Sequence, residues 1–209
     1  MTRTGRTILL TAFEPFGGRS QNASEEALNH LIKHPDLPAG LTLKGYRLPV
    51  ETGTAGRLAC RIIDTVRPDV VICLGEARRE AVCLERFGYN ERRFLIPDNA
   101  GNLIEGEPIL PGAPDRYPAT LPLETMLVAM QATDVPVQLS EDPGRYLCNE
   151  VLYSVLHHLA EHAPDVRAGF IHVPHLPRPD DEPETPSLPA DEVVRALIAG
   201  LGSLFETSP

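Results

Sequence analysis

The sequence lacks a long apolar run and a basic run, and both absences narrow the classes of protein to which it can belong. The one apolar run near the start, Thr7–Phe13, soon meets Glu14 and Pro15 and is too short for a signal-peptide core or a membrane span. The formal net charge is -10, so the chain repels the phosphates of nucleic acids. We therefore expect a cytoplasmic protein that binds neither nucleic acid nor a membrane.

Cysteine is scarce, and its spacing gives no sign of a metal site. The cysteines form no CxxC pair and no metal-ligand spacing with histidine, and the HExxH motif of zinc hydrolases is missing. We expect reduced thiols and a protein that needs neither a metal nor a cofactor. Most of the four should be core residues, because free cysteine is among the most buried residue types; they are Cys60, Cys73, Cys83 and Cys148.

Short apolar runs bounded by turn residues alternate with amphipathic segments along the whole chain. The runs predict strands over Thr7–Phe13, Leu41–Val50, Asp69–Gly75, Val135–Leu139 and Ala168–Val173. The amphipathic segments predict helices over Asn22–His34, Thr54–Val66, Leu147–Glu161 and Asp191–Phe205. This alternation predicts one α/β domain over residues 1–209: a three-layer α/β/α sandwich with a mostly parallel, twisted sheet and helices on both faces. Two stretches rich in Gly and Pro, 99–122 and 174–189, fit neither pattern.

One cysteine stands where a nucleophile would be activated. Cys148 follows a turn-forming Asp-Pro-Gly and begins a predicted helix, whose dipole favours thiolate and whose first N–H groups could stabilise an oxyanion. By contrast, Cys73 lies within a strand and Cys60 within a helix, so both should be inert. Cys83 lies in a predicted polar loop and is the weaker candidate.

A histidine and a carboxylate could complete the set, although each has an ordinary interpretation as well. His172 ends a strand, where a lone histidine is often structural, and His175 competes with it for any role. Glu85 stands beside Arg86 and by itself is typical of a solvated charge. Together, Cys, His and an orienting carboxylate form a complete nucleophilic set, which can assemble from distant parts of the chain.

Two phenylalanines follow the first predicted strand in a chain with only 5% aromatic residues. The two glycines after Phe16 could suggest a phosphate loop, but no GxGxxG and no following Gly-Lys-Ser/Thr are present. Phe13 and Phe16 could therefore form the wall of an apolar pocket or belong to the core, and their spacing alone favours the core.

Four segments, in this order, resemble the pyroglutamyl peptidase I family of cysteine peptidases. They are FEPFGGRSQNAS at 13–24, LERFGYN at 84–90 with IPDN at 96–99, the nucleophile segment Tyr146–Asn149, and FIHVP at 170–174. The resemblance implies an α/β/α sandwich that removes N-terminal 5-oxoproline (pyroglutamate) from peptides through a thioester intermediate. It also implies a homo-oligomer, since members of the family often form tetramers.

The resemblance assigns roles residue by residue. It implies a triad of Cys148, His172 and Glu85, and it places His172 rather than His175 in the family position. It further implies that the flat lactam ring lies between aromatic side chains with a few polar partners. The implied substrate contacts are Phe13, Phe16, Asn22, Glu76, Tyr146 and Leu147.

The sequence departs from the family pattern at two positions. Leu95 stands where members usually carry arginine, and Glu76 stands where glutamine is common. Arg92 or Arg93 could compensate for Leu95, although we expect neither to reach the site. Two alternatives remain open: a nucleoside phosphorylase-like enzyme, which would need a phosphate site, and a binding protein that keeps the pocket without activity.

Overall fold

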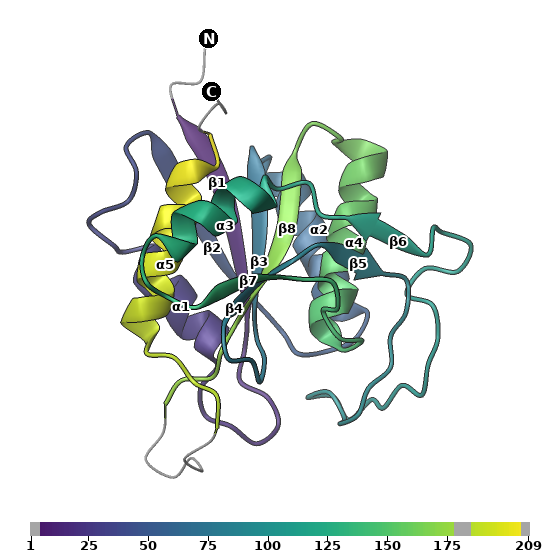
Figure 1. The fold of residues 1–209 in the computed structure, drawn as a ribbon. Coiled ribbons are helices and arrows are strands. Elements are labelled where there is room, and N and C mark those ends of the chain that lie inside the picture. The colour runs from purple at the N-terminus through teal and green to yellow at the C-terminus, as the bar shows by residue number, and fades with distance from the viewer. Residues whose placement is uncertain (1–4, 178–184, 206–209) are drawn as a thin grey trace.

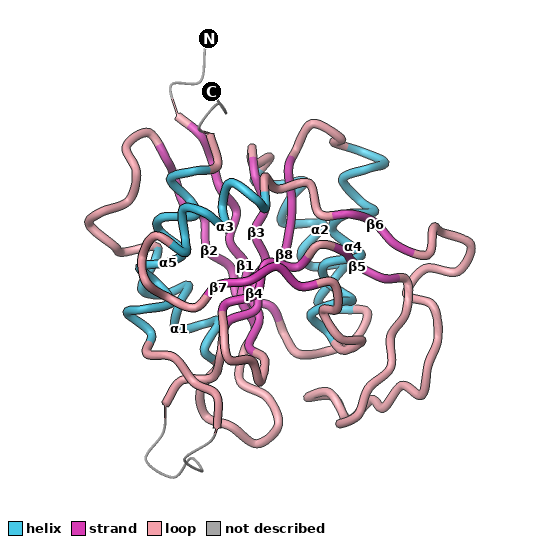
Figure 2. The backbone as a smooth tube through the Cα atoms, viewed as in Figure 1, coloured by secondary structure: helices cyan, strands magenta, loops and turns pink. Residues whose placement is uncertain are grey.

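The computed structural model describes residues 5–177 and 185–205, and a six-stranded sheet forms its centre. The strand order is β2-β1-β3-β8-β4-β7, and every neighbouring pair is parallel except β4 and β8 (Figures 1 and 2). The strands are β1 (Arg6–Phe13), β2 (Leu41–Leu48), β3 (Val70–Glu76), β4 (Val82–Glu85), β7 (Val137–Ser140) and β8 (Arg167–Val173). The predicted mostly parallel sheet is confirmed.

Helices cover both faces of the sheet and complete three layers (Figure 1). One layer contains α1 (Ala23–Leu31), α3 (Leu123–Gln131) and α5 (Ala190–Ser203), and the other contains α2 (Thr54–Val66) and α4 (Leu147–His162). Alternate residues of β1 serve the two layers: Ile8 and Leu10 pack in the first core, whereas Leu9 packs in the second. The near-continuous apolar strands follow from this two-sided burial.

Four elements lie outside the predicted pattern. The short antiparallel pair β5 (Phe87–Tyr89) and β6 (Arg116–Pro118) forms a separate ribbon, and α3 follows a stretch with no predicted structure. The strand β4 has only four residues and lies between charged side chains, so no periodicity marks it. Of the two unassigned stretches, 99–122 contains β6, and residues 178–184 of the other lie outside the described part of the chain.

The strand β4 corrects two predictions. Cys83 is completely buried inside β4 and does not lie in a polar loop. Glu85 ends the same strand and is also completely buried, so it is not a solvated charge. Both misassignments come from the charged neighbours of β4, which conceal a buried strand.

No helix in the described residues is long and apolar enough to cross a membrane.

Candidate active site

Glu85 and His172 form a buried pair between two adjacent strands. His172 Nδ1 lies 2.8 Å from Glu85 Oε1, and the two residues are 2% and 0% exposed. An ionised carboxylate can only accept hydrogen bonds, so it holds the histidine proton on Nδ1 and leaves Nε2 free to accept. Glu85 Oε2 is buried without a hydrogen-bond partner among the described residues, and Arg79 Nη2 lies 3.9 Å from Oε1.

Cys148 is the second residue of α4, as the sequence predicts, and its sulfur lies against the sheet. A Cβ atom on Gly75 would approach Cys148 Sγ to 2.8 Å and Phe170 Cζ to 2.6 Å, so only glycine fits beneath the thiol. Gly75 pairs with His172 in the register of β3 and β8. Because adjacent strands lie about 5 Å apart, this register places the thiol and the imidazole in the same part of the sheet edge.

The pKa of the Cys148 thiol is raised, not lowered as the helix position predicts. Burial is the largest cause, and the negative charge of Glu85 adds to it, with smaller contributions from Cys73 and Glu76. The hydrogen bond of a backbone N–H acts in the opposite direction but does not outweigh these effects. These effects favour the neutral thiol over the thiolate, so attack by the sulfur depends on a nearby base that removes its proton.

A small cavity of about 150 Å³ opens beside these groups. Its lining consists of Phe13, Phe16, Asn22, Val50, Glu76, Ala77, Pro143, Tyr146, Leu147, Cys148 and His172. Every predicted substrate contact thus lines one cavity together with the thiol and the imidazole, while Glu85 lies behind His172. Phe13 is only 3% exposed and also belongs to the core, so the two interpretations of this residue are compatible.

The loop that carries Phe16 is tied to the start of α1. Asn22 Oδ1 accepts hydrogen bonds from the backbone N–H and the hydroxyl of Ser24, at 3.0 and 2.7 Å, and so caps the helix as predicted. Asn22 Nδ2 donates to the carbonyl of Glu14 at 3.0 Å. The amide of Asn22 is largely occupied by these bonds, and one Nδ2 hydrogen remains for a ligand.

Neither arginine near Leu95 lines the cavity. Arg92 donates to Thr52 Oγ1 at 2.9 Å and pairs with Glu107, and Arg93 pairs with Glu91 at 2.9 Å. Leu95 itself is 92% exposed. The N–H groups in the first turn of α4, which have no partner within the helix, are donors that the segment of Cys148 offers.

Sequence reasoning did not find the role of Gly75. The signal was available in principle, because glycine in the interior of a strand often marks a close approach by another group. The sequence could not show which group approaches, because α4 begins at Leu147, 72 positions after Gly75 in the chain.

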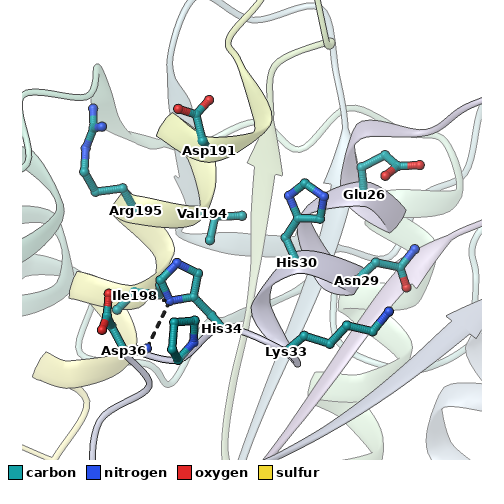
Figure 3. A pocket seen from close by; sticks show the side chains of 11 residues that line it. Glu26, Asn29, His30, Lys33, His34, Asp36, Asp191, Val194, Arg195 and Ile198 are labelled. Carbon is teal, nitrogen blue, oxygen red and sulfur yellow. Dashed lines mark hydrogen bonds and ion pairs between the residues drawn. The ribbon is translucent and has the colours of Figure 1, made fainter.

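A second, larger cavity lies on the opposite helical layer, between α1 and α5 (Figure 3). It has a volume of about 870 Å³, and its lining includes His30 and Glu26 of α1 and Asp191 and Arg195 of α5. Within residues 5–177 and 185–205, no three side chains of His, Cys, Asp or Glu come together to hold a metal ion. None of the residues predicted for catalysis or substrate contact lines this cavity.

Comparison with known proteins gives a consistent family. The family model of pyroglutamyl peptidases matches residues 6–206. The chain is 40% identical over 190 residues to the pyrrolidone-carboxylate peptidase of Thermococcus onnurineus, covering 90% of this chain and 94% of that protein. It is 41% identical over 198 residues to that of Deinococcus radiodurans, covering 91% and 90%.

Solved structures agree with the sequence comparison. The pyroglutamyl peptidase I of Bacillus amyloliquefaciens superimposes with a TM-score of 0.89 at 30% identity, covering 95% of this chain and 96% of that one. A mutant pyrrolidone carboxyl peptidase of Pyrococcus furiosus gives a TM-score of 0.87 at 33% identity, covering 95% and 97%. With a family match over nearly its whole length, the chain belongs to the pyroglutamyl peptidase family of cysteine peptidases.

Proposed function

We propose that this protein is a cysteine exopeptidase that removes an N-terminal pyroglutamyl residue from peptides, with Cys148, His172 and Glu85 as its triad. The observation that carries the proposal is the buried bond between His172 and Glu85 at a cavity that also holds the Cys148 thiol. A nucleophile, a base and an orienting carboxylate are the groups that acyl transfer requires.

The reaction starts from the neutral thiol. His172 Nε2 takes the proton of Cys148 as Sγ attacks the carbonyl carbon that joins the 5-oxoprolyl residue to the next residue. The N–H groups at the start of α4 stabilise the oxyanion of the tetrahedral intermediate. His172 then protonates the leaving amine, and the acyl group remains on sulfur as a thioester.

Water completes the cycle. His172, neutral again, takes a proton from a water molecule, whose oxygen attacks the thioester carbonyl. The second tetrahedral intermediate collapses, pyroglutamate leaves, and the proton returns to the Cys148 sulfur. Glu85 holds the imidazole in one orientation and stabilises its charged form in both halves of the reaction.

The cavity suits a flat, neutral ring. Phe13 and Phe16 supply aromatic walls from the first loop, while Tyr146 and Leu147 close the side next to the thiol. A charged N-terminal amine would lose its hydration in this largely apolar space, whereas a lactam brings no charge. Asn22 Nδ2 is a polar side-chain donor for the lactam oxygen, and Glu76 adds a carboxylate to the cavity lining, although both of its oxygens also accept hydrogen bonds from the protein.

The direct test is hydrolysis of a 5-oxoprolyl chromogenic amide, with the corresponding prolyl amide as the matched control. We expect release of the chromophore from the first compound only, and near-complete loss in Cys148→Ser with the fold retained. Absence of hydrolysis by the wild type would reject the proposal, and tight binding without turnover would favour the binding-protein alternative. Substantial activity in Cys148→Ser would assign the nucleophile elsewhere.

We also propose that residues 1–209 form one domain that acts in the cytoplasm as a homo-oligomer, with a tetramer as the expected form. One central sheet takes strands from both halves of the chain, which supports a single domain. The described cysteines are all unpaired, which suits a reducing compartment. The tetramer rests on the family resemblance. Light scattering of the purified protein tests the oligomeric state. A single unfolding transition would support one domain, and cell fractionation tests the location.

A further inference from the structure

A second Glu–His pair lies beside the first, and an arginine joins it. Glu76 Oε1 lies 2.5 Å from His175 Nδ1 and 2.7 Å from Arg19 Nη1. Glu76 Oε2 accepts the backbone N–H of Ala23 at 2.5 Å. The side chain of Glu76 is 1% exposed, so one buried carboxylate is surrounded by three donors.

The carboxylate and its three donors come from three regions of the chain. Glu76 ends β3, and Ala23 is the first residue of α1. Arg19 belongs to the loop that follows β1, and His175 lies just beyond β8. The cluster therefore ties the loop between β1 and α1 to the ends of two central strands.

Arg19 is the last residue of a turn in that loop that begins at Phe16. Its backbone N–H donates to the carbonyl of Phe16 at 3.1 Å, closing a turn in which Gly17 and Gly18 have φ of 60° and 75°. Ordering such a turn carries a high entropic cost, because glycine loses more backbone freedom on ordering than any other residue. The guanidinium bond to Glu76 fixes the end of the turn, and through it the aromatic ring of Phe16 at the cavity.

We propose that Arg19, Glu76 and His175 form a clamp that positions the Phe16 wall of the substrate cavity, and that Arg19 is the positioning residue on which the clamp depends. This inference rests on the proposed function for its kinetic consequence, but the clamp itself is a property of the loop. The clamp orders the loop before substrate arrives, so that binding does not have to supply the ordering free energy.

The charge balance of the cluster fits a clamp. Burial acts to raise the pKa of Glu76, but the hydrogen bond from His175, the N–H of Ala23 and the charges of His175 and Arg19 outweigh it, and the pKa is lowered. The carboxylate therefore stays ionised. A charge-assisted bond is stronger than a neutral one, which suits a fixed connection between a strand end and a loop.

His175 is not an alternative catalytic base in this arrangement. Its Nδ1 lies within hydrogen-bond distance of both Glu76 Oε1 and Arg19 Nη1, at 2.5 and 2.9 Å, and the residue does not line the cavity that holds Cys148. Its carbonyl accepts the N–H of Leu188 at 3.0 Å, which adds the returning chain segment to the same anchor. The family position selects His172 for catalysis, and the geometry gives His175 a different task.

The kinetic test uses Arg19→Gln, with Arg19→Lys as the conservative variant and Arg47→Gln as the matched control. Arg47 pairs with Glu25 of α1 at 3.2 Å on an exposed surface, and among the described residues its side chain has no hydrogen bond or ion pair with the loop. We expect Arg19→Gln to raise KM for the 5-oxoprolyl amide about tenfold, the scale of one bond to a charged group, with kcat changed less than about twofold. Arg19→Lys should restore most of the affinity, and Arg47→Gln should behave as wild type.

A second measurement is independent of activity. Hydrogen exchange of the amides in residues 14–22 should be faster in Arg19→Gln than in wild type, while exchange in β3 and β8 stays unchanged. Unchanged exchange in the loop would overturn the clamp even if the wild type is an active peptidase. Inactive wild type with faster loop exchange in the variant would reject the proposed function and keep the clamp. A loss confined to kcat in Arg19→Gln or in His175→Asn would place the cluster in the chemistry and overturn the inference.

Discussion

Replacing Gly75 with alanine should displace the nucleophile without unfolding the protein. The added Cβ would lie 2.8 Å from Cys148 Sγ and 2.6 Å from Phe170 Cζ, whereas ordinary contacts begin at 3.4 Å. The backbone of Gly75 has no positive φ, so alanine causes no strain of its own there. The sulfur and the ring therefore each have to move by more than about half an ångström.

The expected magnitude follows from that displacement. A shift of about 1 Å in a reacting group can cost about 100-fold in rate, so kcat/KM of Gly75→Ala should fall by roughly 30- to 100-fold. Overpacking in a core costs about 1–3 kcal/mol of unfolding free energy. For a chain of this size each kcal/mol corresponds to about 2–4 °C in Tm, so the variant should remain folded at 25 °C.

Gly169→Ala is the matched control. Gly169 lies in the adjacent strand β8, and its added Cβ would lie 2.6 Å from Leu121 Cδ1, so the overlap with a side chain is similar but lies away from the thiol. The loss of chain entropy in the unfolded state is the same for both glycines and cancels in the comparison. Calorimetry should give comparable losses of Tm, while only Gly75→Ala loses activity on the 5-oxoprolyl amide. Equal activity in the two variants would refute the close approach of Cys148 to the sheet.

The remaining predictions concern ionisation and the cavity wall. Because the pKa of Cys148 is raised, its alkylation by iodoacetamide should still accelerate above pH 9, and a plateau below pH 8 would instead indicate a preformed thiolate. Burial raises the pKa of Cys60 from 9.0 to about 12 in the folded protein. Between these pH values the unfolded chain has lost the Cys60 proton and the folded chain has not, so stability falls as pH rises. Cys60→Ala should therefore reduce the fall of Tm with pH. Phe13→Ala should cost about 3–5 kcal/mol in denaturant unfolding as well as raise KM, whereas the more exposed Phe16→Ala should mainly raise KM; equal stability losses would remove the distinction.

The elements that the sequence predicts well are those whose pattern is local. Thr54–Val66 agrees with α2 at both ends, because Gly53 precedes it and Pro68 follows it closely. The capping residue Asn22 and the start of a helix just before Cys148 are local signals as well. These features needed no knowledge of the rest of the chain.

The features that escaped prediction depend on distant parts of the chain. Glu85 resembles a solvated acid beside Arg86, and only the pairing of β4 with β8 buries it against His172. The pKa of the thiol also depends on that pairing. The helix terminus is a local feature of the Cys148 segment, whereas the burial of the thiol and the nearby charge of Glu85 arise only in the folded chain. The helix terminus alone therefore does not determine the net direction of the pKa shift.

The two Glu–His pairs show how partners decide the role of the same two side chains. Glu76 receives three donors, one of them the guanidinium of Arg19, so its bond to His175 is one link in a fixed cluster. Glu85 receives His172 on one oxygen, with Arg79 Nη2 farther away at 3.9 Å, while its other oxygen has no hydrogen-bond partner among the described residues. A carboxylate whose charge is not balanced by close donors gains most when its histidine becomes positive, which happens when His172 accepts the proton of the thiol. The unbalanced pair thus suits proton transfer, and the balanced pair suits the positioning of a loop.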